Sequence, residues 1–97
     1  MFIKKKPIRL NGKKINELNK VIHERDGRCI LCHKWVSIEE KFHHQKFGIH
    51  KQDRIECGCI LCYSCHQEVH FGKNSKCLQQ KIEDYLTDLY PVFWLNE

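Results

Sequence analysis

The sequence predicts a small α+β domain that is stabilised by a structural zinc ion and has helices on both sides of the metal ligands. Two features predict this class. The pairs Cys29/Cys32 and Cys62/Cys65 have the C-x-x-C spacing of zinc turns, and apolar residues recur at helical intervals near both ends of the chain. Ninety-seven residues make one domain, spanning 1–97, whose core is thin for its surface. Chains of this size often need disulfides or a structural metal for stability.

A structural metal explains the cysteines better than disulfides do. The opening M-F-I-K-K-K-P-I-R-L lacks the apolar run of a signal peptide, and no later stretch approaches a membrane-spanning length. We therefore expect a cytoplasmic protein with no membrane association. Disulfides rarely persist in a reducing cytosol, and seven cysteines are an odd number for a full disulfide framework.

The first predicted helix covers residues 14–25, where apolar side chains recur at intervals of three and four. They are Ile15, Leu18, Val21 and Ile22. Asp26 and Gly27 then predict a turn that ends this helix.

The middle of the chain is predicted to hold a metal-binding turn and two strands. The turn is expected at residues 29–35, whereas the pattern of residues 37–40 leaves their structure open. Residues 41–47 and 54–61 are the candidate strands, and the polar residues 48–53 join them as a loop.

Two more helices are predicted after the strands. Ser64 and Gln67 have the S-x-x-Q spacing of a capping box, so a short helix is expected to begin there and to run to about His70. An amphipathic helix at about 76–90 is expected to end at Pro91. The apolar residues after this proline are expected to pack back on the core.

Charge is concentrated at the start of the chain, in a basic arm at 1–14. Lys and Arg number 17 against 12 Asp and Glu, which gives a net charge of +5 with neutral histidines. Such an arm can neutralise phosphates and release counterions from nucleic acid, although a solvated tail has the same composition. The candidate nucleic-acid-binding residues are Lys4, Lys5, Lys6, Arg9, Lys13 and Lys14.

Four thiolates of two C-x-x-C pairs can fill all corners of a structural zinc site. A site of this kind contributes about 10–16 kcal/mol of apparent binding energy in zinc-finger peptides, enough to decide folding. Cys59 and Cys62 offer a rival register with the same spacing, but Cys65 stands at the predicted helix start, where zinc turns usually end. Buried cysteines without metal, or a redox pair, are the remaining alternatives.

The histidines suggest a second, open metal site. His66 and His70 are four residues apart on the predicted helix, so that both rings project from one face. His43 and His44 are adjacent on a predicted strand and point to opposite faces, so one can join the helix ligands while its neighbour takes a proton. We expect no special role for the other three histidines, His23, His33 and His50.

The combined pattern R-D-G-x-C-x-x-C, F-H-H and D-R-I-E-C-G-C-I-L-C-x-x-C-H-x-x-x-H resembles the HNH endonucleases, whose core is the ββα-metal fold. The resemblance covers Arg25 to about His70, a motif core of about 25–71. In that family two strands and one helix hold a divalent cation, and zinc turns often brace the unit. The resemblance therefore implies a zinc-stabilised ββα-metal (HNH) domain with flanking N- and C-terminal helices.

The resemblance also implies roles for the histidines. His44 corresponds to the general base that activates water, His43 stands where the family has a metal-binding Asp or His, and His66 and His70 match helix ligands of the colicin-type nucleases. The implied activity is metal-dependent hydrolysis of DNA phosphodiester bonds, by nicking or double-strand cleavage, with Mg²⁺, Mn²⁺, Ni²⁺, Co²⁺ or Zn²⁺ as the catalytic ion. The implied source is phage or bacterial, and the implied partners are DNA and phage packaging proteins.

One position departs from the family pattern. The middle Asn of H-N-H is expected about five residues before Cys62, where this chain has Cys57. That Asn usually orients the base histidine through hydrogen bonds, and a thiol is a weak donor and acceptor. The alternative function is therefore a catalytically weak or inactive zinc-stabilised DNA-binding or interaction module on the same frame. A cysteine-nucleophile enzyme is the third idea, but no base is recognisably paired with Cys57, Cys59 or Cys77.

Overall fold

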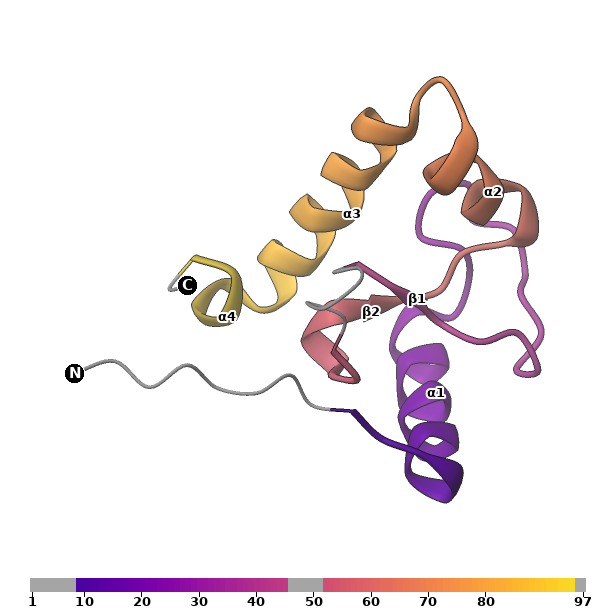
Figure 1. Ribbon diagram of the computed structural model, residues 1–97, viewed down its shortest axis with the longest axis vertical. Coiled ribbons are helices and arrows are strands. Elements are labelled where there is room, and N and C mark those ends of the chain that lie inside the picture. The colour runs from indigo at the N-terminus through magenta and orange to yellow at the C-terminus, as the bar shows by residue number, and fades with distance from the viewer. Residues whose placement is uncertain (1–8, 46–51, 96–97) are drawn as a thin grey trace.

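The computed structural model describes residues 9–45 and 52–95 and has the predicted α+β architecture (Figure 1). A small sheet lies between two longer helices, α1 and α3. The elements in chain order are helix α1 (Gly12–Asp26), strand β1 (His43–His44), a 3-10 helix (Ile55–Cys57), strand β2 (Gly58–Cys59), and helices α2 (Tyr63–Phe71), α3 (Ser75–Leu89) and α4 (Pro91–Leu95). Within the described ranges, no helix has the length and apolar composition required to cross a membrane.

Helix α1 matches the first predicted helix but begins earlier. Its start at Gly12 places Lys13 and Lys14, the end of the predicted basic arm, in its first turn. The helix ends as predicted, because Gly27 adopts φ 74° in the left-handed region and its amide donates to the carbonyl oxygen of His23 at 2.8 Å. The apolar face of α1 packs on the core through the fully buried Ile22.

The segment after α1 forms a tight turn where the sequence predicted one. A β-bridge pairs Arg28 with Trp35, and the amide of Cys29 donates to the carbonyl oxygen of Lys34 at 3.0 Å. Between them His33 adopts φ 65°, and its amide donates to the carbonyl oxygen of Cys29 at 2.9 Å. These bonds close a narrow loop that carries both cysteines of the first pair.

Strands β1 and β2 pair in antiparallel register, with His43 opposite Cys59 and His44 opposite Gly58. In the described part of the chain each strand has two residues, so the prediction of longer strands is wrong in extent. Residues 46 and 47 of the first predicted strand, and most of the predicted loop, lie outside the described residues.

The second predicted strand, 54–61, is interrupted at its start by the 3-10 helix Ile55–Cys57. The amide of Cys57 donates to the carbonyl oxygen of Arg54 at 3.1 Å, a local bond that prevents it from extending the ladder. The carbonyl oxygen of Cys57 still accepts from the amide of Gln45 at 2.8 Å. The chain therefore turns before it pairs, which limits β2 to two residues.

Gly58 allows the sheet to approach α1 closely. A Cβ atom at this position would lie 2.6 Å from a ring carbon of Phe42 and 2.7 Å from the Cδ1 atom of Ile22. Real Cβ contacts are longer than this, so a side chain here would push the strand away from the helix. The glycine thus fixes the distance between β2 and the buried face of α1.

Helix α2 begins one residue before the predicted start, and the predicted capping box is wrong. Its N-cap is Cys62, whose Sγ atom accepts a hydrogen bond from the amide of Cys65 at 3.5 Å. Ser64 lies inside the first turn, where its side chain cannot take the N-cap position. Cys62 of the second C-x-x-C pair therefore caps the helix in place of the expected serine.

Helix α3 ends at Leu89 as predicted, but a further short helix begins at Pro91. This proline is the first residue of α4, a position that suits its fixed φ angle and missing amide hydrogen. The predicted packing of the tail holds for Trp94, which contacts the core and donates through Nε1 to the carbonyl oxygen of Glu56 at 2.9 Å. Val92 and Leu95 are instead exposed, by 74% and 72%.

A buried carboxylate joins α1, the sheet and α3. Asp26 accepts from Nε of Arg25 at 2.7 Å, from the amide of Ile60 at 2.9 Å and from the hydroxyl of Tyr85 at 2.5 Å. Arg25 also donates to the carbonyl oxygen of Ile55 at 2.7 Å. Burial and the hydrogen bond to Asp26 raise the pKa of Tyr85 to about 12, so the hydroxyl keeps its hydrogen at neutral pH.

Candidate metal centre

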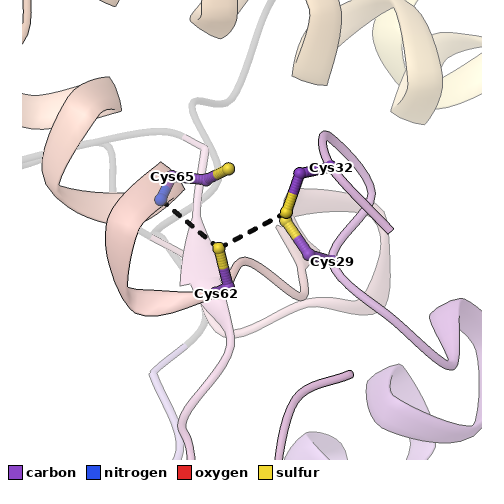
Figure 2. Close-up of side chains that lie close together, drawn as sticks. All are labelled: Cys29, Cys32, Cys62 and Cys65. Atoms are coloured by element: carbon purple, nitrogen blue, oxygen red, sulfur yellow. Dashed lines mark hydrogen bonds between the residues drawn. The ribbon is translucent and has the colours of Figure 1, made fainter. Parts of the chain in front are cut away.

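Four cysteines from two distant segments converge in space (Figure 2). Cys29 and Cys32 come from the loop after α1, and Cys62 and Cys65 come from the start of α2. Their Sγ atoms all lie within 4.8 Å of one another, and those of Cys32 and Cys62 are 3.5 Å apart. A tetrahedral zinc ion with Zn–S bonds of about 2.3 Å places its sulfurs about 3.8 Å apart. The predicted set of cysteines therefore has a spacing that fits zinc.

The electrostatics of the cluster favour a thiolate at one corner. Burial alone would raise the pKa of the Cys29 thiol, but backbone hydrogen bonds from Cys62, Cys32 and Leu31 outweigh it and lower this pKa to about 7. The pKa of Cys65 is instead raised, by burial and by hydrogen bonding to the neighbouring sulfurs. Metal binding requires thiolates, so a bound zinc ion would displace the remaining thiol protons.

The structure separates the cluster from the other candidate ligands. Cys59, the alternative partner of Cys62, is fully buried in β2, and burial raises the pKa of its thiol. Cys57 is also fully buried, and Cys77 is exposed on α3. His33, which directly follows the first pair, is outside the group of four sulfurs. The described residues thus select Cys62 and Cys65 as the second pair.

Three histidines form a second group of potential ligands. His43 is on β1, and His66 and His70 are one turn apart on α2. One ring nitrogen from each lies within 4.8 Å of the others, and the His66 and His70 ring centroids are 4.8 Å apart. The ring of His43 approaches these two edge-on, with centroid distances of 5.2 and 5.6 Å. The predicted set of histidines is therefore brought together and is compatible with metal binding.

The surroundings of His43 and His66 favour the neutral form of each ring. Burial and, less strongly, the nearby rings of His66 and His70 lower the pKa of His43 to about 3, against a hydrogen bond to Gln45 that raises it. Burial and His70 also lower the pKa of His66. A neutral imidazole is the form that donates a lone pair to a metal, so the surroundings of these two rings favour coordination over protonation.

Gln45 is a neighbour of the site that sequence reasoning did not find. Its Nε2 donates to the carbonyl oxygen of Gln79 on α3 at 3.3 Å, which directs its Oε1 toward Nε2 of His43 at 3.3 Å. An amide oxygen accepts only, so Nε2 of His43 carries the hydrogen and Nδ1 is the basic nitrogen. Such outer partners orient metal-binding imidazoles in many proteins. An alternation rule places Gln45 on the same face as His43, but its contact with α3 needed the fold.

Helix α2 links the two groups physically. Its N-cap is Cys62, the amide of His66 donates to the carbonyl oxygen of Cys62 at 2.9 Å, and His70 follows one turn later. A metal held by the cysteines would fix the start of this short helix. The cysteine cluster therefore positions the helix that carries the two histidines.

His44 lies apart from the histidine group and has its own buried partner. Its Nε2 atom is 2.7 Å from Oδ1 of Asp53, and its ring packs against Phe42 at a centroid distance of 4.6 Å. The side chain of His44 is 17% exposed, whereas that of Asp53 is 2% exposed. Asp53 was not predicted as a site residue, because its sequence position in a polar loop carried no signal of burial.

The carboxylate of Asp53 also holds the chain before α1. Its Oδ2 atom accepts from the amide of Leu10 at 2.6 Å and from Nε of Arg9 at 3.1 Å. Burial alone would raise the pKa of Asp53, but the bonds from His44, Leu10 and Arg9 outweigh it and lower this pKa. The carboxylate is therefore ionised at neutral pH and accepts from three donors.

Asn19 of α1 braces the segment that leads into β1. Its Oδ1 accepts from the amide of Phe42 at 2.8 Å, and its Nδ2 donates to the carbonyl oxygens of Ile38 and Glu40 at 3.1 and 3.4 Å. The separation of 23 residues between Asn19 and Phe42 along the chain carries no sign of this contact. The structure brings it next to the residues that precede His43.

The predicted nucleic-acid-binding residues are placed only in part. Lys13 and Lys14 are exposed at the start of α1, and the Arg9 side chain is 56% exposed beside Asp53. Lys4, Lys5 and Lys6 lie outside the described residues.

Comparisons with protein-family models, with curated proteins and with solved structures find no match to this chain. What the geometry supports is a small α+β domain with four cysteines that can hold a structural metal such as zinc, and with a histidine group compatible with metal binding. The function that follows from these groups is therefore proposed below from their chemistry.

Proposed function

We propose that the protein is a metal-dependent endonuclease of the HNH type that hydrolyses DNA phosphodiester bonds. The observation that carries the proposal is the grouping of His43 from β1 with His66 and His70 from α2, while the adjacent His44 is held separately. This is the division between metal ligands and base that the resemblance implied. The order of two paired strands followed by the ligand-bearing helix adds support.

In the proposed reaction His44 accepts a proton from water. The water oxygen bonds to phosphorus as this proton moves to the ring, and the bond between phosphorus and the 3′ oxygen breaks. The 3′ oxygen takes a proton from solvent, so the products are a 5′-phosphate and a 3′-hydroxyl. An imidazole with an ordinary pKa of about 6.5 suits this proton transfer near neutral pH.

The three imidazole ligands favour some divalent ions over others. His43, His66 and His70 would hold a divalent cation, which supplies Lewis-acid stabilisation of negative charge on the phosphate oxygens. Imidazole nitrogens suit Zn²⁺, Ni²⁺, Co²⁺ or Mn²⁺ better than Mg²⁺, which prefers oxygen ligands. We therefore expect transition metals to support activity better than magnesium.

Exposed cations near the site fit a polyanionic substrate. Arg9 lies beside the carboxylate that contacts His44, and Lys13 and Lys14 follow at the start of α1. Cations at a helix N-terminus add to the partial positive charge of the helix dipole. We expect DNA to bind across this region with a strong salt dependence.

A zinc-stabilised DNA-binding or interaction module is the second candidate, and Cys57 favours it. This residue occupies the position of the family Asn, is fully buried, and cannot match the hydrogen bonding of an amide. Under this alternative the histidines bind metal without catalysis. Cys57→Asn tests the point, because a gain in cleavage would show that the thiol weakens a working nuclease.

A supercoiled-plasmid cleavage assay tests the proposed function. Wild type, His44→Ala and His33→Asn are compared with Mg²⁺, Mn²⁺, Co²⁺, Ni²⁺ and Zn²⁺ in turn. His33→Asn is the matched control because His33 is exposed, belongs to neither ligand group, and Asn tolerates its left-handed backbone. We expect metal-dependent nicking by wild type and by the control, with a loss of at least about 100-fold in His44→Ala. If wild type fails to cut DNA with every one of these metals, or if His44→Ala cuts as well as wild type, the binding module is the better account.

A further inference from the structure

The contact between His44 and Asp53 joins the ring of the proposed base to a buried carboxylate. Oδ1 of Asp53 lies 2.7 Å from Nε2 of His44, and the carboxylate side chain is 2% exposed. The opposite oxygen, Oδ2, is occupied by the amide of Leu10 at 2.6 Å and by Nε of Arg9 at 3.1 Å. Each oxygen therefore has assigned donors, and the carboxylate cannot rotate without breaking them.

The chemistry of these contacts fixes where the ring hydrogen of His44 lies. An ionised carboxylate accepts hydrogen bonds and donates none, so Nε2 of His44 must carry the hydrogen. In the neutral ring Nδ1 is then the basic nitrogen. The ring plane is fixed as well, because Phe42 packs against it at a centroid distance of 4.6 Å.

We propose that Asp53 is the positioning residue for the base, holding His44 as the Nε2–H tautomer so that Nδ1 receives the proton from water. The proposal rests on the proposed nuclease function. Asp53 takes over the orienting task that an Asn performs in the HNH pattern and that the buried Cys57 cannot perform. The same carboxylate holds Nε of Arg9, so a cationic side chain that is 56% exposed is kept beside the base.

The substitution Asp53→Asn tests this role with almost no change in volume. Leu10 and Arg9 both donate to Oδ2, so an amide at position 53 keeps its oxygen toward them. Its NH₂ group then faces Nε2 of His44, which must become an acceptor. We therefore expect the variant to hold His44 as the opposite, Nδ1–H tautomer, as an Asp→Asn change does in the serine-protease triad.

Two readouts separate the positioning role from the nuclease itself. Two-bond ¹H–¹⁵N NMR correlations at pH 8.5, above the ordinary histidine pKa of about 6.5, report the tautomer of His44 without any substrate. Plasmid cleavage by the metal-loaded protein reports kcat and KM. We expect the Nε2–H tautomer in wild type, the Nδ1–H tautomer in Asp53→Asn, and a loss of at least about 100-fold in kcat that exceeds any change in KM.

His33→Asn is the matched control. His33 is exposed, lies outside both the histidine group and the His44–Asp53 pair, and Asn tolerates its left-handed backbone. We expect it to keep the wild-type tautomer of His44 and the wild-type kcat and KM.

Several outcomes would overturn the positioning role. A wild-type His44 in the Nδ1–H tautomer refutes it, and so does an Asp53→Asn variant that keeps the wild-type tautomer, whether or not the protein cuts DNA. An inverted tautomer with an unchanged kcat refutes it as well. Failure of wild type to cleave with any metal counts against the proposed nuclease function alone, because the tautomer is measured independently.

Discussion

Substitution of Cys32 by Ser is the sharpest test of zinc binding by the four cysteines. Cys32 is the exposed member of the group, yet its Sγ atom lies 3.5 Å from that of Cys62. Removing an exposed sulfur leaves no cavity in the core, so a loss of stability reports the missing metal ligand and not lost packing. Cys77→Ser is the matched control, because Cys77 is exposed on α3 and outside the cluster.

The expected size of the effect follows from the metal site. Four-ligand zinc sites contribute about 10–16 kcal/mol of apparent binding energy, so one ligand of four corresponds to about 2.5–4 kcal/mol. In a domain of this length, each kcal/mol shifts Tm by about 4–8 °C. We therefore expect Cys32→Ser to lower Tm by about 10–30 °C. Cys77→Ser should lower it by less than about 4 °C, as exposed substitutions change stability by about 0.5 kcal/mol or less.

Thermal unfolding of the zinc-loaded proteins, with metal content measured by mass spectrometry, makes the comparison. Wild type and Cys77→Ser should each retain zinc after dialysis against a weak chelator, whereas Cys32→Ser should lose it. A strong chelator should bring all three proteins to one common Tm, below that of zinc-loaded Cys32→Ser. If Cys32→Ser keeps its zinc and melts with the control, the four cysteines do not form the site.

Three further predictions concern stability. Asp26→Ala should lower the free energy of unfolding, measured in urea, by about 3–5 kcal/mol, because Arg25 loses its carboxylate partner while its side chain is only 15% exposed. A change below about 1 kcal/mol would show that this ion pair does not stabilise the fold. Trp94→Phe should cost about 1 kcal/mol in the same assay, because it removes the indole bond to the carbonyl oxygen of Glu56 at 2.9 Å and keeps an apolar ring; an unchanged midpoint would argue that α4 does not hold this contact in solution. The pKa of His43 is about 3 when folded against about 6.5 when unfolded, so the unfolded chain binds the extra proton and stability should fall as pH drops from about 6.5 toward 3. Urea unfolding of the zinc-loaded protein at stepped pH should show this slope reduced in His43→Gln, and an equally steep slope in the variant would contradict the assignment.

Spacing along the chain was enough to predict the ligand groups. The interval between Cys62 and Cys65 fits the first turn of a helix, and the interval between His66 and His70 fits one face of a helix. Short-range geometry therefore constrains both pairs directly. The helical periodicity of α1 and α3 was equally local, and both helices were predicted nearly in full. These features depend on covalent geometry and on the period of the apolar residues, both of which can be read from the sequence.

Predictions failed where two hydrogen-bond partners compete for the same backbone group. The cap of α2 is Cys62 and not Ser64, because the chain entering the helix directs the cysteine sulfur at the free amide. The second strand was shortened because the amide of Cys57 bonds locally to Arg54. In both cases the sequence offered two acceptable partners, and the path of the backbone chose between them.

The sequence by itself determined the α+β class, the two helical ends and which residues could bind a metal, since these follow from composition, periodicity and the reach of neighbouring side chains. Tertiary structure alone decided that Asp53 contacts His44 and that Asn19 supports the strand before it. These pairs come from segments whose separation along the chain carries no information about distance in space. A buried carboxylate also requires donors to balance its desolvation, and only the folded chain supplies them, from Arg9, Leu10 and His44 together.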